Sequence, residues 1–588
     1  MSATEQTTEK RFPLVLLTGA GAVWHLNYPT ARGMWDGLKV LFGQVSAPAG
    51  WDSEAPAGRR NDRPSWPDAK QGWAQFHEAA GENFEHLLDS ARGAQQGGDR
   101  DDRRYGEALE DAVMTYVAAI LSRDPQARPG VRFPETMRGD RRLMPLAHFF
   151  FYLTEHMQPR ADAPLPVVPL FTTNYDPTYD ALAEFCGWSD LNCDRRLTES
   201  MRVHTPTRPA RYTPRLIDPR DPNAPYAGED RTPVVEVNYL QGHLSWWRDD
   251  AGQDVRSFWG PERPPGLSRA WLPPGTDKLP VYTSHFDPHD WLRAAVTDAS
   301  VLAVIGQGLR DRNLFGFIQA AARRNQDLRI VVIDPFDPGT GLMEEAFGPA
   351  YGQGRVLWVP APFTPCLFPL MAQALWRRAA GGDDRELAEG CWHQVAALLD
   401  DSCVALSAAQ PAPLSPAEQH IGNYAVVHAL PHQVTATAYA EVILEPIFEG
   451  KYARGICFRR WGSDGVWLAV GAELGDPETH RLVLRQLDPD DPRGVNDLAD
   501  YWAFPGTPPW ASEPDLGDHQ FRTSPFRLLM SIVGERVTVA ALWPEGYVTG
   551  VLSADLGDRL TGELEVGVFF WGETPESHIG DLRIAGSI

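Results

Sequence analysis

The sequence predicts an α/β domain with a doubly wound parallel sheet and a helical insertion, followed by an all-β sandwich. Short apolar runs that end in glycine or asparagine, separated by segments of helical periodicity, indicate the first domain. Beyond residue 419 the period changes to two, and turns rich in Gly, Asp and Pro separate short strands. The expected division of the chain is a tail over 1–10, a first domain over 11–380, a helix and Pro-rich linker over 381–418, and a sandwich over 419–588.

Composition and charge narrow the function classes. The 588 residues are 43% hydrophobic and 22% charged, as in soluble proteins of several domains. A formal net charge of -24 at pH 7 excludes a general nucleic-acid or anionic-membrane binder, because both need a positive surface. Residues 1–10 lack the features of a signal peptide and no run approaches 18 apolar residues, so we expect a cytoplasmic protein without a membrane span.

The elements of the first domain follow from its apolar runs. Phe12 to Thr18 is a short apolar run before Gly19-Ala20-Gly21, which is typical of a buried parallel strand. Within an insertion over about 65–160, helical spacing predicts three helices, at 73–91, 105–121 and 144–153. A second buried strand at 167–172 leads to Asn174.

A stronger α/β pattern follows after position 300. It consists of a strand at 301–305, a turn through Gly306 and Gly308, a helix at 313–324 and a strand at 329–333 that ends at Asp334. Before it, one strand is expected at 234–240, between Pro-rich stretches at 205–232 and 261–280 that are expected to be loops.

Gly19-Ala20-Gly21 after a strand is a weak phosphate-binding signal. Such a turn lets the backbone approach a pyrophosphate at a helix N-terminus. The third glycine of the dinucleotide fingerprint is replaced by Trp24, so a tight structural turn is the alternative reading.

Further segments in order resemble one family. The stretch from Gly19 to Thr30 resembles the Gly-Ala-Gly motif of sirtuins, and Thr172-Thr-Asn-Tyr-Asp176 matches the Thr-x-Asn-x-Asp motif of prokaryotic sirtuin-like NAD hydrolases. Segments 240–246, 305–311 and 333–335 resemble the remaining motifs of that family. The resemblance implies a Rossmann-like domain that takes NAD as substrate or ligand.

The resemblance also implies a role for each matched position. The residues implied to line the pyrophosphate are Thr18, Gly19, Ala20 and Gly21. Those implied to act catalytically beside the nicotinamide ribose are Asn174 and Asp176, and those implied to hold the adenosine half are Gly306, Gly308 and Asp334. A strand-end cap is the alternative for Asn174 and Asp334.

Two departures from the family pattern bear on catalysis. The family histidine falls on Gln241, and glutamine cannot act as a general base near neutral pH. His243 would face the same way as Gln241 on a strand and could replace it as a catalytic residue, or it could be a packed loop histidine. The motif serine is replaced by Val23.

No metal site is expected. The cysteines form no Cys-x-x-Cys pair, which argues against a zinc ribbon and against the four-cysteine zinc module of sirtuin deacylases. The His/Asp cluster at 284–290 could bind a metal, but a helix N-terminal cap before Trp291 explains it more simply.

The last 150 residues resemble concanavalin A-like lectin and glucanase sandwiches. Glu563 and Glu565 have the spacing of paired catalytic carboxylates, although alternation on a solvent-facing strand explains them better. Recognition of a protein or glycan is the more natural role. Tryptophans that could form a platform for it, or else pack in the core, are Trp461, Trp467, Trp502, Trp510 and Trp571.

Together these features predict an NAD glycohydrolase that acts as effector of a bacterial anti-phage defence system. It would cleave the nicotinamide–ribose bond when the sandwich or a partner senses infection, as a homo-oligomer or in complex with a defence partner. The alternatives are a catalytically inactive module that binds NAD or an ADP-ribose-type nucleotide and regulates an assembly, and a scaffold with a vestigial cleft.

Overall fold

The computed structural model describes residues 12–44, 65–121, 167–182, 234–243, 288–359 and most of the strands between 404 and 586, with short gaps inside these ranges. Elsewhere it describes the short strands at 210–212, 246–249, 255–257 and 267–269 and isolated residues. The predicted tail, the helix near 385–400 and the proline cluster at 410–416 lie outside the described residues, whereas residues 404–406 of the predicted linker form a strand that pairs within the C-terminal sheets. Most of the predicted helix at 144–153 also lies outside the described residues. No helix within the described ranges is long and apolar enough to cross a membrane.

The first domain is built on a seven-stranded sheet in the order β10-β9-β8-β1-β2-β4-β3. Its strands are β1 (Phe12–Thr18), β2 (Val167–Thr172), β3 (Ala210–Tyr212), β4 (Val234–Tyr239), β8 (Ala299–Ile305), β9 (Arg329–Ile333) and β10 (Val356–Val359). All neighbours pair in parallel except β3, which is an antiparallel edge strand. Numbered along the chain, the six parallel strands run 6-5-4-1-2-3, the order of a doubly wound Rossmann-like sheet. The predicted fold class is therefore confirmed.

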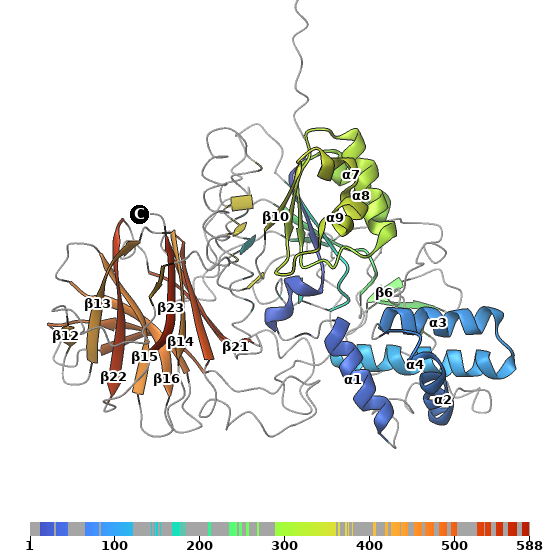
Figure 1. The fold of residues 1–588 in the computed structure, drawn as a ribbon, viewed down its shortest axis with the longest axis horizontal. Coiled ribbons are helices and arrows are strands. Elements are labelled where there is room, and N and C mark those ends of the chain that lie inside the picture. Colours follow the sequence, from blue (N-terminus) through green and yellow to red (C-terminus); the bar gives the residue numbers. More distant parts are fainter. Residues whose placement is uncertain are drawn as a thin grey trace, which may run out of the picture.

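The sheet is buried on both faces, as the apolar runs predicted. Along β1, Leu14 and Leu16 belong to one core cluster, and Val15 and Leu17 belong to another. The first cluster includes apolar residues of α1 (Ala31–Gly43), and the second includes those of α7 (Pro288–Thr297), α8 (Arg312–Arg324) and α9 (Thr340–Phe347). Figure 1 shows α7, α8 and α9 grouped apart from α1 and the helical insertion.

The helical insertion contains α2 (Trp66–Phe76), α3 (Phe84–Gly97) and α4 (Arg100–Leu121). The helix predicted at 105–121 is confirmed and starts earlier. The single helix predicted at 73–91 is wrong, because two helices meet there. Helix α2 starts at a capping box between Ser65 and Asp68, and Gly81 at φ 59° turns the chain before α3.

Short elements fill the connections. A small sheet in the order β6-β5-β7 contains β5 (Trp246–Asp249), β6 (Val255–Ser257) and β7 (Leu267–Arg269), and α10 (Pro349–Gly352) precedes β10. The Pro-rich stretches at 205–232 and 261–280 were expected to be loops, but each contains one three-residue strand, β3 and β7. Each of these strands pairs at the edge of a sheet, where backbone pairing outweighs a poor local propensity.

The C-terminal region contains two antiparallel sheets, as expected for a sandwich. The first has the order β11-β23-β14-β19-β20-β21, and the second β12-β13-β22-β15-β16-β17-β18. Their bounds are β11 (Val404–Leu406), β12 (Glu418–Ile421), β13 (Ala425–Val434), β14 (Thr437–Leu444), β15 (Tyr452–Arg460), β16 (Trp467–Leu474), β17 (Arg481–Leu487), β18 (Val495–Trp502), β19 (Phe526–Val533), β20 (Arg536–Leu542), β21 (Val548–Asp555), β22 (Leu564–Gly572) and β23 (Ile579–Gly586).

The two sheets share one hydrophobic core. Ile456 and Val470 of one sheet belong to the same buried cluster as Met530 and Val539 of the other sheet. The tight hairpin predicted around 532–537 is confirmed by the pairing of Val533 with Arg536.

Candidate functional site

A cavity of about 990 Å³ opens at the carboxyl ends of the parallel strands. It is lined from the loops after β1, β2, β4, β8 and β9 and from the helical insertion. The strand order reverses between β1 and β8, and crevices at such a reversal are where doubly wound sheets bind ligands. Its volume is at the upper end of the range for small-molecule sites.

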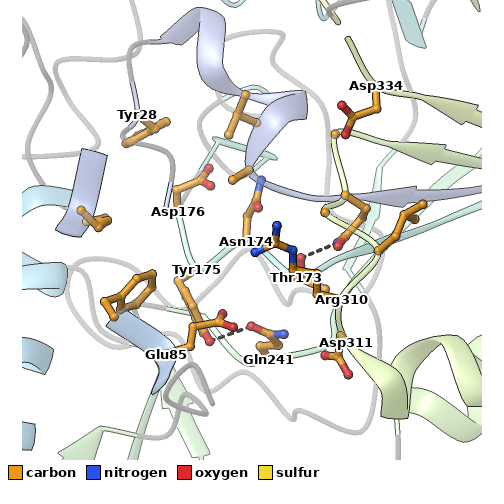
Figure 2. A pocket seen from close by; sticks show the side chains of 18 of the residues that line it. Tyr28, Glu85, Thr173, Asn174, Tyr175, Asp176, Gln241, Arg310, Asp311 and Asp334 are labelled. Carbon is orange, nitrogen blue, oxygen red and sulfur yellow. Dashed lines mark hydrogen bonds between the residues drawn. The ribbon is translucent and has the colours of Figure 1, made fainter. Parts of the chain in front are cut away.

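The predicted site residues divide into two groups. Those that line the cavity are Ala20, Asn174, Asp176, Gly306, Gly308 and Asp334. Those that lie outside its lining are Thr18, Gly19, Gly21 and His243. Figure 2 shows Asp334 on one side of the cavity, Tyr175 and Gln241 on the opposite side, and Asn174 between them.

Gly19 and Gly21 serve the packing of two loops. The Gly19 N–H donates to the Ile305 carbonyl at 2.9 Å, and the Gly21 N–H donates to the Gly306 carbonyl at 3.1 Å. A Cβ on Gly306 would lie 2.5 Å from the Gly21 Cα, and Gly306 also has φ of 60°. These glycines therefore bring the loops after β1 and β8 into backbone contact, and Ala20 alone of Gly19-Ala20-Gly21 reaches the cavity.

Gln307 joins three strand ends and was not predicted from the sequence. Its Nε2 donates to the Thr18 carbonyl at 3.1 Å and to the Thr173 hydroxyl at 2.6 Å. The Thr173 N–H also donates to the Thr18 carbonyl, at 3.0 Å. The Thr18 carbonyl at the end of β1 therefore accepts from the loop after β8, through Gln307, and from the loop after β2, through Thr173. Hydrogen bonds as well as packing hold these three strand ends together.

Asn174 is fixed through its amide nitrogen. Its Nδ2 donates to the Gly19 carbonyl at 3.0 Å, and its N–H donates to the Thr172 hydroxyl at 3.1 Å. The side chain is 7% exposed. With Nδ2 held by the protein, Oδ1 is the atom that can accept a hydrogen bond from a ligand hydroxyl or a water.

Asp176 is buried beside Thr178. Its Oδ1 accepts from the Thr178 N–H at 3.0 Å and from the Thr178 hydroxyl. Burial raises the pKa of the carboxyl group, and this outweighs the lowering by Thr178 and by the charge of His243. Burial also raises the pKa of Tyr179, whose hydroxyl donates to Thr18 Oγ1 at 2.9 Å.

Gln241 lines the cavity, whereas His243 is buried outside the cavity lining. The Tyr175 hydroxyl donates to Gln241 Oε1 at 2.6 Å. Strand β4 ends at Tyr239, so the strand alternation that would place Gln241 and His243 on one face does not apply. His243 is 1% exposed, and its ring lies 4.5 Å from the ring of Tyr239.

The loop from β8 to α8 brings positive charge to the cavity. Arg310 and Arg312 both line it, and Arg312 pairs with Glu345 at 2.6 Å. Asp311 caps α8 through a hydrogen bond from the Leu314 N–H at 3.0 Å. Leu309 has φ of 53°, which is unusual for a residue other than glycine.

The end of β9 contributes a carboxylate and an exposed ring. Asp334 Oδ1 accepts from the Phe336 N–H at 2.9 Å, and burial raises the pKa of Asp334. The Asp334 backbone is held by Val359 and by the Trp358 indole. The Phe336 side chain is 79% exposed and lines the cavity, although it follows a buried strand.

The helical insertion supplies one wall, which was not predicted to be part of the site. Its lining residues are Phe84, Glu85, His86, Val117 and Leu121. Their positions between helical apolar residues gave no sequence signal of function, and only the packing of α3 and α4 brings them to the strand ends.

The candidate residues of the sandwich are mostly paired or packed. Glu565 pairs with Arg459 at 2.6 Å, whereas Glu563 precedes β22 and is exposed. Trp467 is fully buried, under the Arg459 guanidinium at 4.5 Å. Trp571 is half-buried and lies 5.1 Å from the guanidinium of Arg485. Trp461, Trp510 and the side chain of Trp502 lie outside the described residues.

No group of three or more His, Cys, Asp or Glu side chains within the described ranges could hold a metal ion. Helix α7 begins at Pro288, inside the 284–290 cluster and earlier than predicted, so Asp290 lies in its first turn; residues 284–287 lie outside the described ranges.

No protein-family model and no curated protein matches the sequence. Among solved structures, a Sir2 homologue in complex with NAD aligns over 63% of this chain and 90% of its own, with a TM-score of 0.27 and 14% identity. Lectin I-B4 of Griffonia simplicifolia covers 28% of this chain and 81% of its own, with a TM-score of 0.18 and 16% identity. Lectin II of Ulex europaeus covers 29% and 85%, with a TM-score of 0.19 and 11% identity. The fold assignment rests on the strand order and pairing.

Proposed function

We propose that the cavity binds NAD, with the adenosine half beside Asp334 and the nicotinamide ribose beside Asn174. The observation that carries this proposal is the site's position, since Asn174 and Asp334 line one cavity where the strand order reverses. Arg310, which lines the cavity and lies next to Asn174 in Figure 2, would neutralise the pyrophosphate. The motif resemblance described above supports the same ligand.

We further propose that the chain is an NAD glycohydrolase. Cleavage of the nicotinamide–ribose bond develops positive charge on the ribose, which an oxygen acceptor stabilises. Asn174 Oδ1 would accept from the ribose or from the attacking water, and Asp176 would contribute negative charge. His243, which is buried outside the cavity lining, would act through its charge on Asp176.

The biological role that we propose is that of an effector in bacterial anti-phage defence. In this role residues 11–380 deplete NAD, and a sandwich over 419–588 senses an infection-linked partner and so controls the activity. A homo-oligomer or a complex with a defence partner fits this role.

The test compares NAD consumption by the wild-type chain and by Asn174→Ala. Nicotinamide release is followed by chromatography with the purified chain, and NAD content is followed in phage-infected cells. Asn325→Ala is the matched control, because Asn325 is also buried and donates to the Ala299 carbonyl at 2.6 Å, but lies outside the cavity. If Asn174→Ala consumes NAD as fast as the wild-type chain does, this cavity is not the site of NAD cleavage.

A second candidate function is a non-catalytic module that binds NAD or ADP-ribose. The hydrogen bond between Tyr175 and Gln241 favours it, because a neutral amide occupies that part of the cavity wall. Calorimetric binding of NAD without release of nicotinamide would support this module, and turnover would exclude it.

A further inference from the structure

Two amide side chains of the cavity meet at Gly19. Asn174 Nδ2 donates to the Gly19 carbonyl at 3.0 Å, and a Cβ on Gly19 would lie 2.8 Å from the amide carbon of Gln307. Asn174 comes from the loop after β2 and Gln307 from the loop after β8, and both line the cavity. The lack of a side chain at Gly19 therefore leaves room for the Gln307 amide beside Asn174.

Hydrogen bonds fix the direction in which each amide points. Gln307 Nε2 donates to the Thr18 carbonyl at 3.1 Å and to the Thr173 hydroxyl at 2.6 Å. A carbonyl oxygen can only accept, so the nitrogen of Gln307 must face Thr18. The nitrogen of Asn174 must face the Gly19 carbonyl for the same reason. Oε1 of Gln307 and Oδ1 of Asn174 are therefore directed away from these carbonyls.

Both amide oxygens are open to a ligand. Within the part of the chain that the structure describes, neither oxygen accepts a hydrogen bond from the protein, and neither is sealed off from solvent. Gln307 is 8% exposed and Asn174 is 7% exposed, so the little surface that each keeps open belongs to the cavity that both line. The cavity wall thus presents two neighbouring acceptors.

A sugar is the part of a nucleotide that suits two neighbouring acceptors. Each ribose hydroxyl can donate one hydrogen bond, whereas an ionised phosphate only accepts. Thr173, whose hydroxyl holds the Gln307 amide, lies beside Asn174 in Figure 2. Gln307 is therefore tied to the same loop that carries the proposed ribose contact, Asn174.

We infer that Gln307 Oε1 and Asn174 Oδ1 together bind the hydroxyls of the nicotinamide ribose, an inference that rests on the proposed binding of NAD. Each oxygen accepts from one hydroxyl of the sugar ring. A site built to hydrogen-bond a hydroxyl discriminates against a ligand that lacks it, because its acceptor is left unpaired. Gln307 thus helps the cavity to select nucleotides that carry this second ribose.

The experiment compares two ligands by calorimetry on the full-length chain: ADP-ribose, which has this ribose, and ADP, which lacks it. We expect Gln307→Met to weaken binding of ADP-ribose by about five- to tenfold, the effect of one hydrogen bond, and to leave ADP affinity within about twofold. Gln319→Met is the matched control, because Gln319 also donates to a backbone carbonyl, that of Glu345, but lies outside the cavity. It should change neither affinity.

Thr173→Val tests the support of the Gln307 amide. It removes the hydroxyl that accepts from Nε2 and leaves Oε1 in the chain. ADP-ribose affinity should fall by less than in Gln307→Met, and the double variant should bind no more weakly than Gln307→Met alone, because both changes act through one amide. Melting temperatures show whether each variant folds. If Gln307→Met does not fold, Thr173→Val decides, since it too should weaken ADP-ribose and spare ADP.

Two results would overturn the role of Gln307. Equal weakening of ADP-ribose and ADP would show that Gln307 only supports its loop, and unchanged affinity for both would show that it does not contact the ligand. In either case a wild-type chain that binds NAD leaves the proposed ligand standing. A wild-type chain that binds neither NAD nor ADP-ribose refutes the proposed ligand and this inference together. Absence of nicotinamide release contradicts the proposed hydrolysis alone.

Discussion

The Tyr175 hydroxyl donates to Gln241 Oε1 at 2.6 Å, which joins the loop after β2 to the loop after β4 across the cavity wall. These two residues are 66 positions apart in the chain. The bond fixes the amide of Gln241, so its loss should loosen the end of the cavity opposite Asp334.

Tyr175→Phe should therefore weaken NAD binding by several-fold and lower the free energy of unfolding by about 1 kcal/mol, the typical worth of one hydrogen bond. Calorimetry and thermal denaturation measure the two effects. Tyr179→Phe is the control, since its buried hydroxyl donates to Thr18 outside the cavity lining. Equal loss of affinity in both variants would argue against a specific role for Tyr175.

Phe336 should stack on the adenine ring. An exposed ring at the rim of a cavity gains apolar contact with a planar base, worth about 1–3 kcal/mol in comparable aromatic stacking. Phe336→Ala should weaken binding of NAD and ADP-ribose by about tenfold or more, and Phe336→Tyr should preserve it. Nicotinamide mononucleotide, which lacks adenine, is the control ligand. Its affinity should not change.

Asp334 should select NAD over NADP. Its carboxylate can accept from ribose hydroxyls but repels a 2′-phosphate. Wild type should bind NADP at least about tenfold more weakly than NAD, and Asp334→Asn should narrow this gap. Asp337→Asn tests whether the effect is local, because Asp337 also lines the cavity. Equal NADP and NAD affinities in wild type would contradict the assignment of the adenosine end.

The ionised carboxylate of Asp176 should lower the free energy of unfolding at neutral pH. Its pKa is raised in the folded chain, mainly by burial, so the folded state binds the proton more tightly than the unfolded state does. The cost is absent below the unfolded pKa of about 4 and grows as the pH rises through the folded pKa. Asp176→Asn should raise the melting temperature at pH 7, by the equivalent of about 1–2 kcal/mol, and match wild type near pH 4.

Thermal scans from pH 4 to pH 8 measure this difference, with the exposed Asp327→Asn as control. The same Asp176→Asn variant should lose NAD turnover, since its carboxylate is placed in the site. A variant that is less stable than wild type at every pH would show that Asp176 makes favourable contacts as an anion.

Arg355 should be essential for the stability of the first domain. It is 5% exposed, and its guanidinium donates to the carbonyls of Ala322, Asn325 and Leu328 around the end of α8. Arg355→Met removes these donors and should lower the free energy of unfolding by about 2 kcal/mol or more. Arg324→Met, at an exposed position of the same helix, should have little effect in the same denaturant titration.

The sequence by itself determined the fold class and most of its strands. In the apolar runs at 12–18, 167–172 and 329–333, side chains on both faces of the strand are apolar, so both faces must be buried. The period of two after residue 419 fits strands with one buried face. Strand β12, with mixed polar residues, gave no such pattern. The break between α2 and α3 was missed because apolar residues continue at helical spacing across it.

Only the tertiary structure decided how the site is built. The sequence pointed to Gly19 and Gly21 as pyrophosphate contacts, but their lack of a Cβ serves contact with Gly306, which lies far along the chain. Gln307, Phe336 and Glu85 carry no motif, because nothing local distinguishes a cavity residue from a surface residue. Their positions depend on strand order and helix packing, which bring distant segments together only once the chain is folded.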